Sequence, residues 1–390
     1  MQKIQVGVAY GGRSVEHEVS IISALQAIRA LDKEKYEPVP LYISKQGIWY
    51  TGDNLLDIRN YRDINMLLST CKKIYFSQNH HDFMIVGTEA TGMFKKTFSH
   101  KIDVVMPVIH GTHGEDGCLQ GLLELSGVPY TGPAVLGSAC GMDKIIMKAV
   151  LKEAGLPTPD YHWFYMHQWH DDQEQICKIL EEKISYPMIV KPADLGSSIG
   201  VTAVDNIEEL LEAVSLAGSF ANRILIEKFI NPLREINCSV LGCPENQETS
   251  VCEEPIAAAK FLSYGDKYLC GGTKGMSGAQ RRIPADLDES ITQKIQDYAR
   301  RAFVALDEYG VCRIDFLMNA DSNEIFVNEI NTIPGSLSFY LWEPTGKTFS
   351  QLLDDLIRLA LKRSRKKEKM IFSYASNILA QGGGFKGSKK

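Results

Sequence analysis

Short apolar runs and longer segments with helical spacing follow one another along the first third of the chain. An apolar run at 4–10 predicts a strand, and the spacing from about Val15 to Leu31 predicts a helix with Ser14 as its N-cap. Further apolar runs at 37–43 and 103–109 predict two more strands. This order favours an α/β fold with a parallel sheet. Residues from about 53 to 100 fit the pattern less well and are expected to hold an insertion or an extra hairpin.

The same patterning continues to about residue 365. Helices are predicted over 118–126, from 142 to a Gly-Leu-Pro stop at 155–157, over 207–217 and over 349–364. Strands are predicted at 188–191 and 224–229, near 235–241 and 252–260, and in a hairpin over 311–331.

A chain of 390 residues exceeds what one hydrophobic core normally serves, so several domains are expected. The predicted divisions are an N-terminal α/β domain at 1–133, a central domain at 134–230, a C-terminal domain at 231–365 and a tail at 366–390. The tail is basic and rich in glycine, which is typical of a solvated end, and binding of an acidic partner is the less favoured alternative.

Composition narrows the class of protein. The chain is 44% hydrophobic and 23% charged with a net charge of −6, so nothing indicates nucleic acid or an acidic membrane as a partner. Its nine cysteines contain no C-x-x-C pair, so neither a zinc site nor a disulfide framework is signalled. The opening MQKIQVGVAY reads as a strand and no apolar run has the length of a membrane span. A cytoplasmic enzyme is the expectation.

The hairpin predicted over 311–331 carries the clearest chemistry. Side chains alternate faces along a strand, so Arg313 and Asp315 share one face of the first strand, and Glu329 and Asn331 share one face of the second. Three oxygen ligands and a guanidinium would then converge. Such oxygen ligands suit Mg²⁺ held against nucleotide phosphates. The alternative is a solvated sheet face that happens to carry charges.

Nucleotide binding, if present, must use a design other than the Walker A loop, because no G-x-x-x-x-G-K-[ST] pattern occurs. Lys191 ends a predicted strand, and the Gly-Ser-Ser-Ile-Gly loop at 196–200 follows and could cradle phosphates with its N–H groups. Lys144 begins a helix in the same half, and the segment 227–230 offers a carboxylate and an aromatic for an adenine slot. Each piece also has a purely structural interpretation, as an ordinary turn or strand end. Together they favour an ATP-dependent ligase.

At this point the chain resembles the D-alanine–D-alanine ligases of the ATP-grasp superfamily. The resemblance covers residues from about 4 to 365. It rests on GGRSVEHEVS at 11–20, HGTHGEDGCLQG at 110–121, MDK at 142–144, VKPADLGSSIGV at 190–201, EKFI at 227–230, SYGDKY at 263–268, RID at 313–315 and NEINTIPG at 328–335. It implies a three-domain fold that grips ATP between the central and C-terminal domains, and ligation of two D-alanines through an acyl phosphate for peptidoglycan precursor synthesis.

The resemblance also implies roles for individual residues. The residues matched to ATP contacts are Lys144, Lys191, Glu227, Phe229, Ile230, Glu235, Phe261 and Lys267. Those matched to ligands of two Mg²⁺ ions, which Mn²⁺ could replace, are Asp315, Glu329 and Asn331. Those matched to catalysis are Glu16, which holds the first D-alanine, Ser197 and Tyr268, which form a hydrogen-bond network with it, and Arg313 and the Gly335 N–H, which face the oxyanion. His110 lines the pocket of the first D-alanine. A homodimer is implied as well.

One segment departs from the family pattern. In the family, Pro-Gly is followed by a segment that ends in a Ser-Leu pair, and this pair grips the carboxylate of the second substrate. Here Pro334-Gly335 leads instead to Ser-Leu-Ser-Phe-Tyr-Leu-Trp-Glu over 336–343. Ser336, Ser338 and Tyr340 are all candidates for that contact. D-serine, D-lactate or another amino acid therefore remains an alternative acceptor, although a tyrosine at 268 favours D-alanine over D-lactate. A third possibility is a nucleotide-binding regulator without ligase activity.

Overall fold

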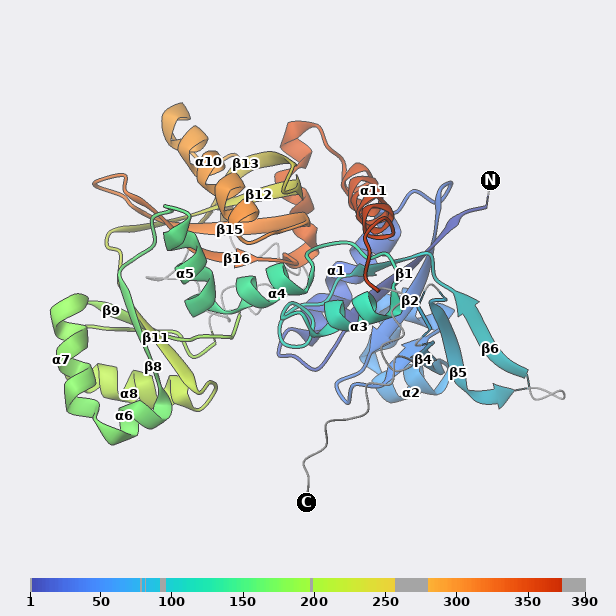
Figure 1. The fold of residues 1–390 in the computed structure, drawn as a ribbon, viewed down its shortest axis with the longest axis horizontal. Coiled ribbons are helices and arrows are strands. Elements are labelled where there is room, and N and C mark those ends of the chain that lie inside the picture. Colours follow the sequence, from blue (N-terminus) through green and yellow to red (C-terminus); the bar gives the residue numbers. More distant parts are fainter. Residues whose placement is uncertain are drawn as a thin grey trace, which may run out of the picture.

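Three β-sheets organise the described part of the chain, and each lies in a lobe of its own (Figure 1). The structure is a computed structural model that describes residues 2–77, 79–80, 82–91, 96–196, 199–256 and 280–373. The four-stranded sheet lies at the lower left of Figure 1, the five-stranded sheet above it and the seven-stranded sheet at the right. The predicted α/β class is confirmed. The predicted domain limits at 133, 230 and 365 stay predictions.

The N-terminal sheet has the strand order β6-β5-β4-β3-β2-β1-β7. Its central strand β1 (Ile4–Gly11) runs parallel to β2 (Tyr36–Ile43) and to β7 (Val104–Pro107). The remaining strands join antiparallel beyond β2, and they are β3 (Trp49–Thr51), β4 (Lys72–Phe76), β5 (Met84–Thr91) and β6 (Lys96–Lys101). The extra hairpin expected between 53 and 100 is therefore present as β5 and β6. The short helices η1 (Asp53–Leu56), η2 (Ile58–Arg62) and α2 (Ile64–Ser69) precede it.

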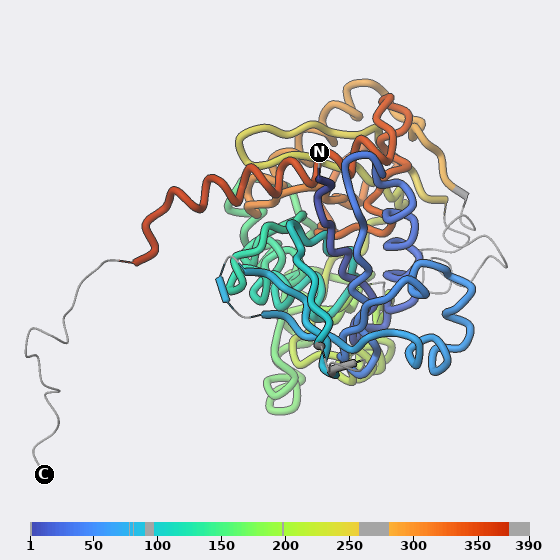
Figure 2. Tube along the Cα trace, turned by 90° about the vertical axis from the view of Figure 1, so that its right-hand side faces the viewer, coloured from blue at the N-terminus to red at the C-terminus, as the bar shows by residue number. Residues whose placement is uncertain are grey.

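The principal helices of this lobe are α1 (His17–Ala30), α3 (Cys118–Ser126) and α11 (Phe349–Lys367). The expected capping of α1 by Ser14 is wrong. Glu16 occupies the N-cap position, while the Ser14 hydroxyl donates to the carbonyl of His110 at 2.7 Å. Helix α11 comes from the far end of the chain, yet its apolar face packs into the core of the N-terminal sheet. Its last turns project from the body of the molecule (Figure 2).

The second sheet is antiparallel with the order β10-β9-β11-β8. Its strands are β8 (Tyr161–Tyr165), β9 (Met188–Pro192), β10 (Thr202–Val204) and β11 (Arg223–Lys228). Helices α6 (Met166–Asp171), α7 (Gln173–Lys183) and α8 (Ile207–Gly218) share its hydrophobic core. One face of the sheet is thus covered by helices.

The third sheet is antiparallel with the order β14-β13-β12-β15-β16. Its strands are β12 (Leu233–Cys243), β13 (Asn246–Ile256), β14 (Gln280–Arg282), β15 (Gly310–Asn319) and β16 (Ile325–Asn331). Its core includes residues of α10 (Glu289–Ala305) and of α5 (Lys144–Glu153), which follows α4 (Val135–Met142) in the chain. The short helices η4 (Gly335–Leu341) and η5 (Glu343–Thr345) lead from β16 to α11.

No helix in the described ranges is long and apolar enough to cross a membrane. The cysteines of the same ranges are all free thiols.

Candidate active site

The predicted hairpin forms, and its register places the expected side chains opposite one another. Arg313 of β15 pairs with Asn331 of β16, and Asp315 pairs with Glu329. A β-bulge follows, because the next pair is Phe316 with Val327 and Asn328 is left as the extra residue. A bulge interrupts the alternation of side chains. Asn328 and Glu329 therefore both reach the same pocket although they are neighbours in sequence.

Asp315 is the centre of this polar group. Arg313 donates to both of its carboxylate oxygens, with Nε 2.7 Å from Oδ1 and Nη2 2.7 Å from Oδ2. The amide of Asn331 donates to Oδ2 at 3.0 Å. Burial would lower the pKa of Arg313, but the ion pair with Asp315 outweighs it and holds that pKa well above its usual value. The guanidinium is thus a permanent positive charge.

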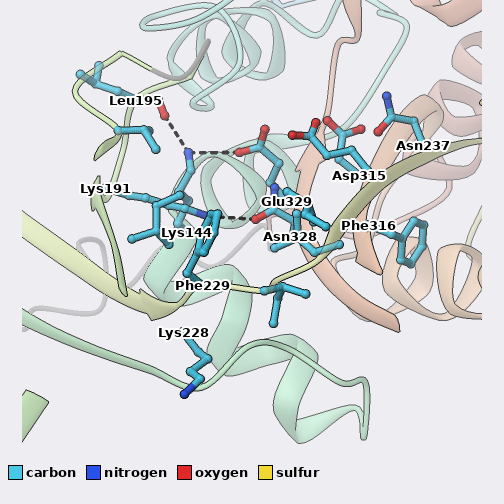
Figure 3. A pocket seen from close by; sticks show the side chains of 16 residues that line it. Lys144, Lys191, Leu195, Lys228, Phe229, Asn237, Asp315, Phe316, Asn328 and Glu329 are labelled. Carbon is cyan, nitrogen blue, oxygen red and sulfur yellow. Dashed lines mark hydrogen bonds and ion pairs between the residues drawn. The ribbon is translucent and has the colours of Figure 1, made fainter. Parts of the chain in front are cut away.

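The donor set fits Mg²⁺ bound together with phosphates. Among the described residues, no three or more His, Cys, Asp or Glu side chains lie close enough together to hold a metal ion by themselves. Asp315 and Glu329 provide two carboxylates, and Asn331 provides an amide oxygen on the same face. Mg²⁺ characteristically takes one or two carboxylates from a protein and completes its shell with water and phosphate oxygens. Asn237, which sequence reasoning missed, also lines this pocket, and its amide points toward Asp315 (Figure 3).

A pocket lies between the four-stranded and five-stranded sheets (Figure 3). It encloses about 810 Å³ including its open mouth, which is within the usual range for a small-molecule site. The predicted residues that line it are Lys144, Lys191, Phe229, Ile230, Glu235, Asp315 and Glu329. The apolar side chains of Ile189, Val201 and Leu317 also form its wall. One end is thus suited to a flat apolar group and the other to phosphates and metal.

Two buried lysines supply the positive charge at the polar end. Lys144 opens α5 after Asp143, whose side chain caps the helix, and its Nζ lies 3.4 Å from Oε2 of Glu329. The same ammonium donates to the carbonyl of Leu195 at 2.6 Å. Lys191 of β9 donates to Oδ1 of Asn328 at 3.0 Å. Both ammonium groups are therefore anchored beside the carboxylates of the hairpin (Figure 3).

Glu227 has a different position from the one expected at the adenine edge. Its carboxylate is fully buried and is not part of the pocket wall, which Lys228, Phe229 and Ile230 form instead. Oε1 pairs with Lys148 at 2.6 Å and Oε2 pairs with Lys191 at 2.5 Å. Burial would raise the pKa of Glu227, but the two ammonium groups outweigh it and lower that pKa to about 2. Burial lowers the pKa of Lys148, with Glu227 opposing.

A second polar group lies where α1 meets the loop after β7. Glu16 is buried at the N-cap position of α1. A Cβ added to Gly111 would lie 2.8 Å from Oε2 of Glu16, and one added to Gly196 would lie 3.4 Å from it. The carboxylate thus lies between the loop of the N-terminal sheet and the Gly-Ser loop of the four-stranded sheet. Glycine at 111 leaves room for it and also meets the backbone's positive φ of 77°.

His110 links this group to the segment after the hairpin. Its Nδ1 lies 2.9 Å from the carbonyl of Ile333, which fixes Nδ1–H as the donor, and its Nε2 lies 3.0 Å from the hydroxyl of Ser23. That hydroxyl in turn accepts the N–H of Ser336 at 3.0 Å. Burial lowers the pKa of His110, so the ring is neutral.

Glu115 makes a parallel link that sequence reasoning did not find. Its two oxygens accept the N–H groups of Gly111, at 2.6 Å, and of Ile333, at 3.1 Å. Burial and the neighbouring Glu16 raise the pKa of Glu115 to about 8. The 110–117 loop and the segment leading into η4 are therefore held together through both His110 and Glu115.

The segment after Gly335 forms a left-handed turn. Ser336, Leu337 and Ser338 have φ angles of 51°, 53° and 51°, a conformation that costs residues other than glycine roughly 1–2 kcal/mol each. Ser336 donates its hydroxyl to Gln26 at 2.6 Å, and Tyr340 donates its hydroxyl to Glu253 at 3.2 Å. Ser338 is fully buried, and its hydroxyl has no hydrogen-bond partner among the described residues.

Four predicted site residues lie outside the described residues, namely Ser197, Phe261, Lys267 and Tyr268. The described residues that sequence reasoning missed include Lys148, Asn328, Asn237 and Glu115. Lys148 could have been found from the sequence, because it follows Lys144 by four positions and so lies on the same face of the helix. Asn328 could not have been found in this way, because strict alternation along a strand places its side chain on the face opposite to that of Glu329.

Two family models match the chain. The model described as D-ala D-ala ligase N-terminus matches residues 5–133, and the one described as D-ala D-ala ligase C-terminus matches residues 150–358. The D-alanine--D-alanine ligase of Natranaerobius thermophilus is 41% identical over 380 residues, which cover 95% of this chain and 98% of that protein.

Solved structures of ligases also resemble this chain. The D-alanine-D-alanine ligase from Coxiella burnetii has a TM-score of 0.77 and 31% identity, and the match covers 95% of this chain and 97% of that one. The VanG D-Ala:D-Ser ligase from Enterococcus faecalis has a TM-score of 0.77 and 30% identity, with 92% and 100% covered. The fold is that of the ATP-grasp ligases. Within that class, this chain belongs to the D-alanine–D-alanine ligase family.

Proposed function

We propose that this chain ligates two D-alanines to D-alanyl-D-alanine at the expense of ATP, in the cytoplasm and for peptidoglycan precursor synthesis. The observation that carries the proposal is the juxtaposition of Lys144 and Lys191 with Asp315 and Glu329 in one pocket between two sheets. Two ammonium groups can pair with the phosphates of a nucleoside triphosphate, and two carboxylates can bind its metal ions. The family assignment supports the same reaction.

The nucleotide would lie with its base against Phe229 and Ile230 and its ribose near Glu235. Lys144 and Lys191 would hold the phosphates, because each ammonium is already fixed by a protein oxygen and loses little freedom on binding. Asp315, Glu329 and Asn331 would hold two Mg²⁺ ions, which Mn²⁺ could replace, and these would neutralise charge on the transferring phosphoryl group. Phe261 and Lys267 are proposed to cover the nucleotide.

The first D-alanine would bind with its ammonium on Glu16, beside His110. Its carboxylate oxygen attacks the γ-phosphorus of ATP, the bond to the ADP oxygen breaks, and an acyl phosphate forms. Because His110 is neutral, it adds no positive charge that would compete with the ammonium for Glu16. Ser197 and Tyr268 are proposed to complete a hydrogen-bond network with Glu16.

The amine of the second D-alanine then attacks the acyl carbon. The new C–N bond forms, the bond to the phosphate oxygen breaks, and inorganic phosphate leaves as the amine loses a proton. Arg313 and the N–H of Gly335 would face the oxyanion that develops; one such donor is typically worth about 3–4 kcal/mol. The permanent charge of Arg313 suits this task.

The second substrate is proposed to be D-alanine. The curated relatives carry the D-alanine--D-alanine ligase name, so they favour D-alanine over the alternatives D-serine and D-lactate. Tyr268 supports the same choice. The candidates for gripping its carboxylate are Ser336 and Ser338, which lie in the left-handed turn, and Tyr340, which follows the turn in η4.

One assay tests the reaction and the acceptor together. Purified protein is incubated with Mg²⁺, ATP and D-alanine, alone or with D-serine or D-lactate, while phosphate release is measured and products are identified by mass. We expect D-alanine-dependent phosphate release and D-alanyl-D-alanine as the product. Phosphate release from ATP at the same rate with and without D-alanine would contradict the proposal and favour a nucleotide-binding regulator. A homodimer is also proposed, and light scattering after size-exclusion chromatography tests it.

A further inference from the structure

A closed ring of buried polar contacts lies behind the phosphate end of the pocket. Lys148 pairs with Oε1 of Glu227 at 2.6 Å and donates to the carbonyl of Asn328 at 3.2 Å. Lys191 pairs with Oε2 of Glu227 at 2.5 Å and donates to the side-chain oxygen of Asn328 at 3.0 Å. Each ammonium therefore bridges the same two residues. Hereafter these four residues are called the lysine ring.

The lysine ring draws its members from both walls of the pocket. Lys191 and Glu227 come from the four-stranded sheet, Asn328 from the bulge of the five-stranded sheet, and Lys148 from α5. Lys148 and Glu227 are both completely inaccessible to solvent, whereas Lys191 and Asn328 line the pocket. A ligand in the pocket thus meets only one of the two lysines.

The charges of the lysine ring explain why a second, hidden lysine is useful. Glu227 alone would neutralise Lys191, because opposite charges 2.5 Å apart in a buried site largely cancel at a distance. Lys148 adds a second positive charge, so two ammonium groups and one carboxylate leave the lysine ring at +1. That charge is available at the pocket surface through Lys191. Burying an ammonium is costly unless it is paired, and Glu227 provides that pairing for both lysines.

We propose that Lys148 is a positioning residue that keeps Lys191 able to bind nucleotide phosphates, by sharing the carboxylate of Glu227 and holding the bulge at Asn328. The inference rests on the proposed function, since it presumes that the pocket binds ATP. It assigns Glu227 to the support of Lys191 and leaves contact with the base to Phe229 and Ile230. Lys148 itself touches neither nucleotide nor substrate.

The test varies the charge of the lysine ring while leaving the base-binding wall unchanged. Dissociation constants for ATP and for adenosine, each with Mg²⁺, are measured by calorimetry for the full chain. Lys148→Met reduces the ring charge to zero, and we expect ATP binding to weaken at least ~10-fold while adenosine binding changes less than ~2-fold. The double variant Lys148→Met/Glu227→Gln returns the ring charge to +1, because it loses one ammonium and one carboxylate. Glutamine at 227 can still accept a hydrogen bond from Lys191, so this variant should recover most of the ATP affinity. The kinetic counterpart is a raised KM for ATP.

Lys152→Met is the matched control, because Lys152 lies exposed on the same helix; ATP affinity should equal that of the wild type. Three results would overturn the inference: wild-type ATP affinity in Lys148→Met, equal loss of ATP and adenosine affinity, or a double variant weaker than the single one. If Lys148→Met does not fold, Glu227→Gln and the double variant replace it, with ring charges of +2 and +1. The double variant should then bind ATP more weakly than Glu227→Gln. Failure of the wild type itself to bind ATP would instead overturn the proposed function.

Discussion

Arg313 and Asp315 form a two-point ion pair within one strand, with both donor–acceptor distances at 2.7 Å. Two residues apart on β15, they point to the same face, so the guanidinium is fixed by the carboxylate proposed to hold metal. This contact orients Arg313 from within its own strand. Asp315 also accepts the amide of Asn331 at 3.0 Å, so it keeps one donor when Arg313 is replaced.

Replacing Arg313 by alanine should separate binding from catalysis. We expect kcat to fall about 100- to 1000-fold, because one preorganised oxyanion donor is lost, while the dissociation constant for ATP changes less than about 3-fold. Arg313→Lys should recover only part of kcat, since an ammonium cannot reproduce the two-point contact with Asp315. Steady-state kinetics and calorimetry measure the two quantities. An unchanged kcat in Arg313→Ala would refute the assigned role.

Removing the charge of Glu329 should weaken metal binding. Glu329→Gln replaces one of the two carboxylates of the proposed Mg²⁺ site and also removes the partner of Lys144. We expect the apparent Mg²⁺ affinity to fall about 10-fold or more, and Mn²⁺ binding in the presence of ADP, followed by electron paramagnetic resonance, to weaken in parallel. Glu324→Gln, exposed in the turn of the same hairpin, is the control and should leave both values unchanged. Equal metal affinity in the two variants would argue against the site.

The two serines of the left-handed turn should respond differently to alanine. Ser338→Ala removes a buried hydroxyl that has no partner among the described residues, so stability should hold or rise by up to about 1–2 kcal/mol. If that hydroxyl grips the second substrate, KM for the second D-alanine rises about 10-fold while KM for ATP does not change. Ser336→Ala breaks a bond to Gln26 and should lower stability by about 1 kcal/mol. Kinetics and urea unfolding distinguish the outcomes, and an unchanged acceptor KM in Ser338→Ala would exclude Ser338.

Glu308 should make stability depend on pH. It is fully buried between α10 and β15, with the thiol of Cys312 3.4 Å from Oε2, and burial raises its pKa from 4.5 to about 8. An acid whose pKa is raised by folding contributes stability that is fully present below pH 4.5 and is lost as the pH rises through 8. Glu308→Gln should flatten the free energy of unfolding over this window and raise it at neutral pH by up to about 3 kcal/mol.

Urea unfolding at several pH values measures this effect. Glu212→Gln, on the exposed face of α8, is the control and should leave the pH profile as it is in the wild type. A Glu308→Gln profile with the wild-type slope would show that Glu308 does not titrate in this window.

Local periodicity accounts for much of what could be predicted. Helix α3 matches its predicted limits, and the pairing of Arg313 with Asn331 and of Asp315 with Glu329 agrees with simple alternation. Both depend on residues close in sequence, where the spacing of side chains along a helix or strand is nearly fixed. Strand alternation also singled out Asp315, Glu329 and Asn331 as metal ligands. Glu16, Glu235 and Lys267 came from motif resemblance, which locates residues but not their contacts.

Long-range packing decided the rest. The sequence by itself determined the positions of several helices and strands, the family and the face of the hairpin that carries Asp315 and Glu329. Only the tertiary structure placed Glu227 behind the pocket wall, between Lys148 and Lys191, and brought α11 onto the first sheet. Only it showed the bulge that turns Asn328 into the pocket. The physical reason is that burial and ion pairing depend on which distant surfaces meet, and side-chain periodicity along one element carries no information about its partner.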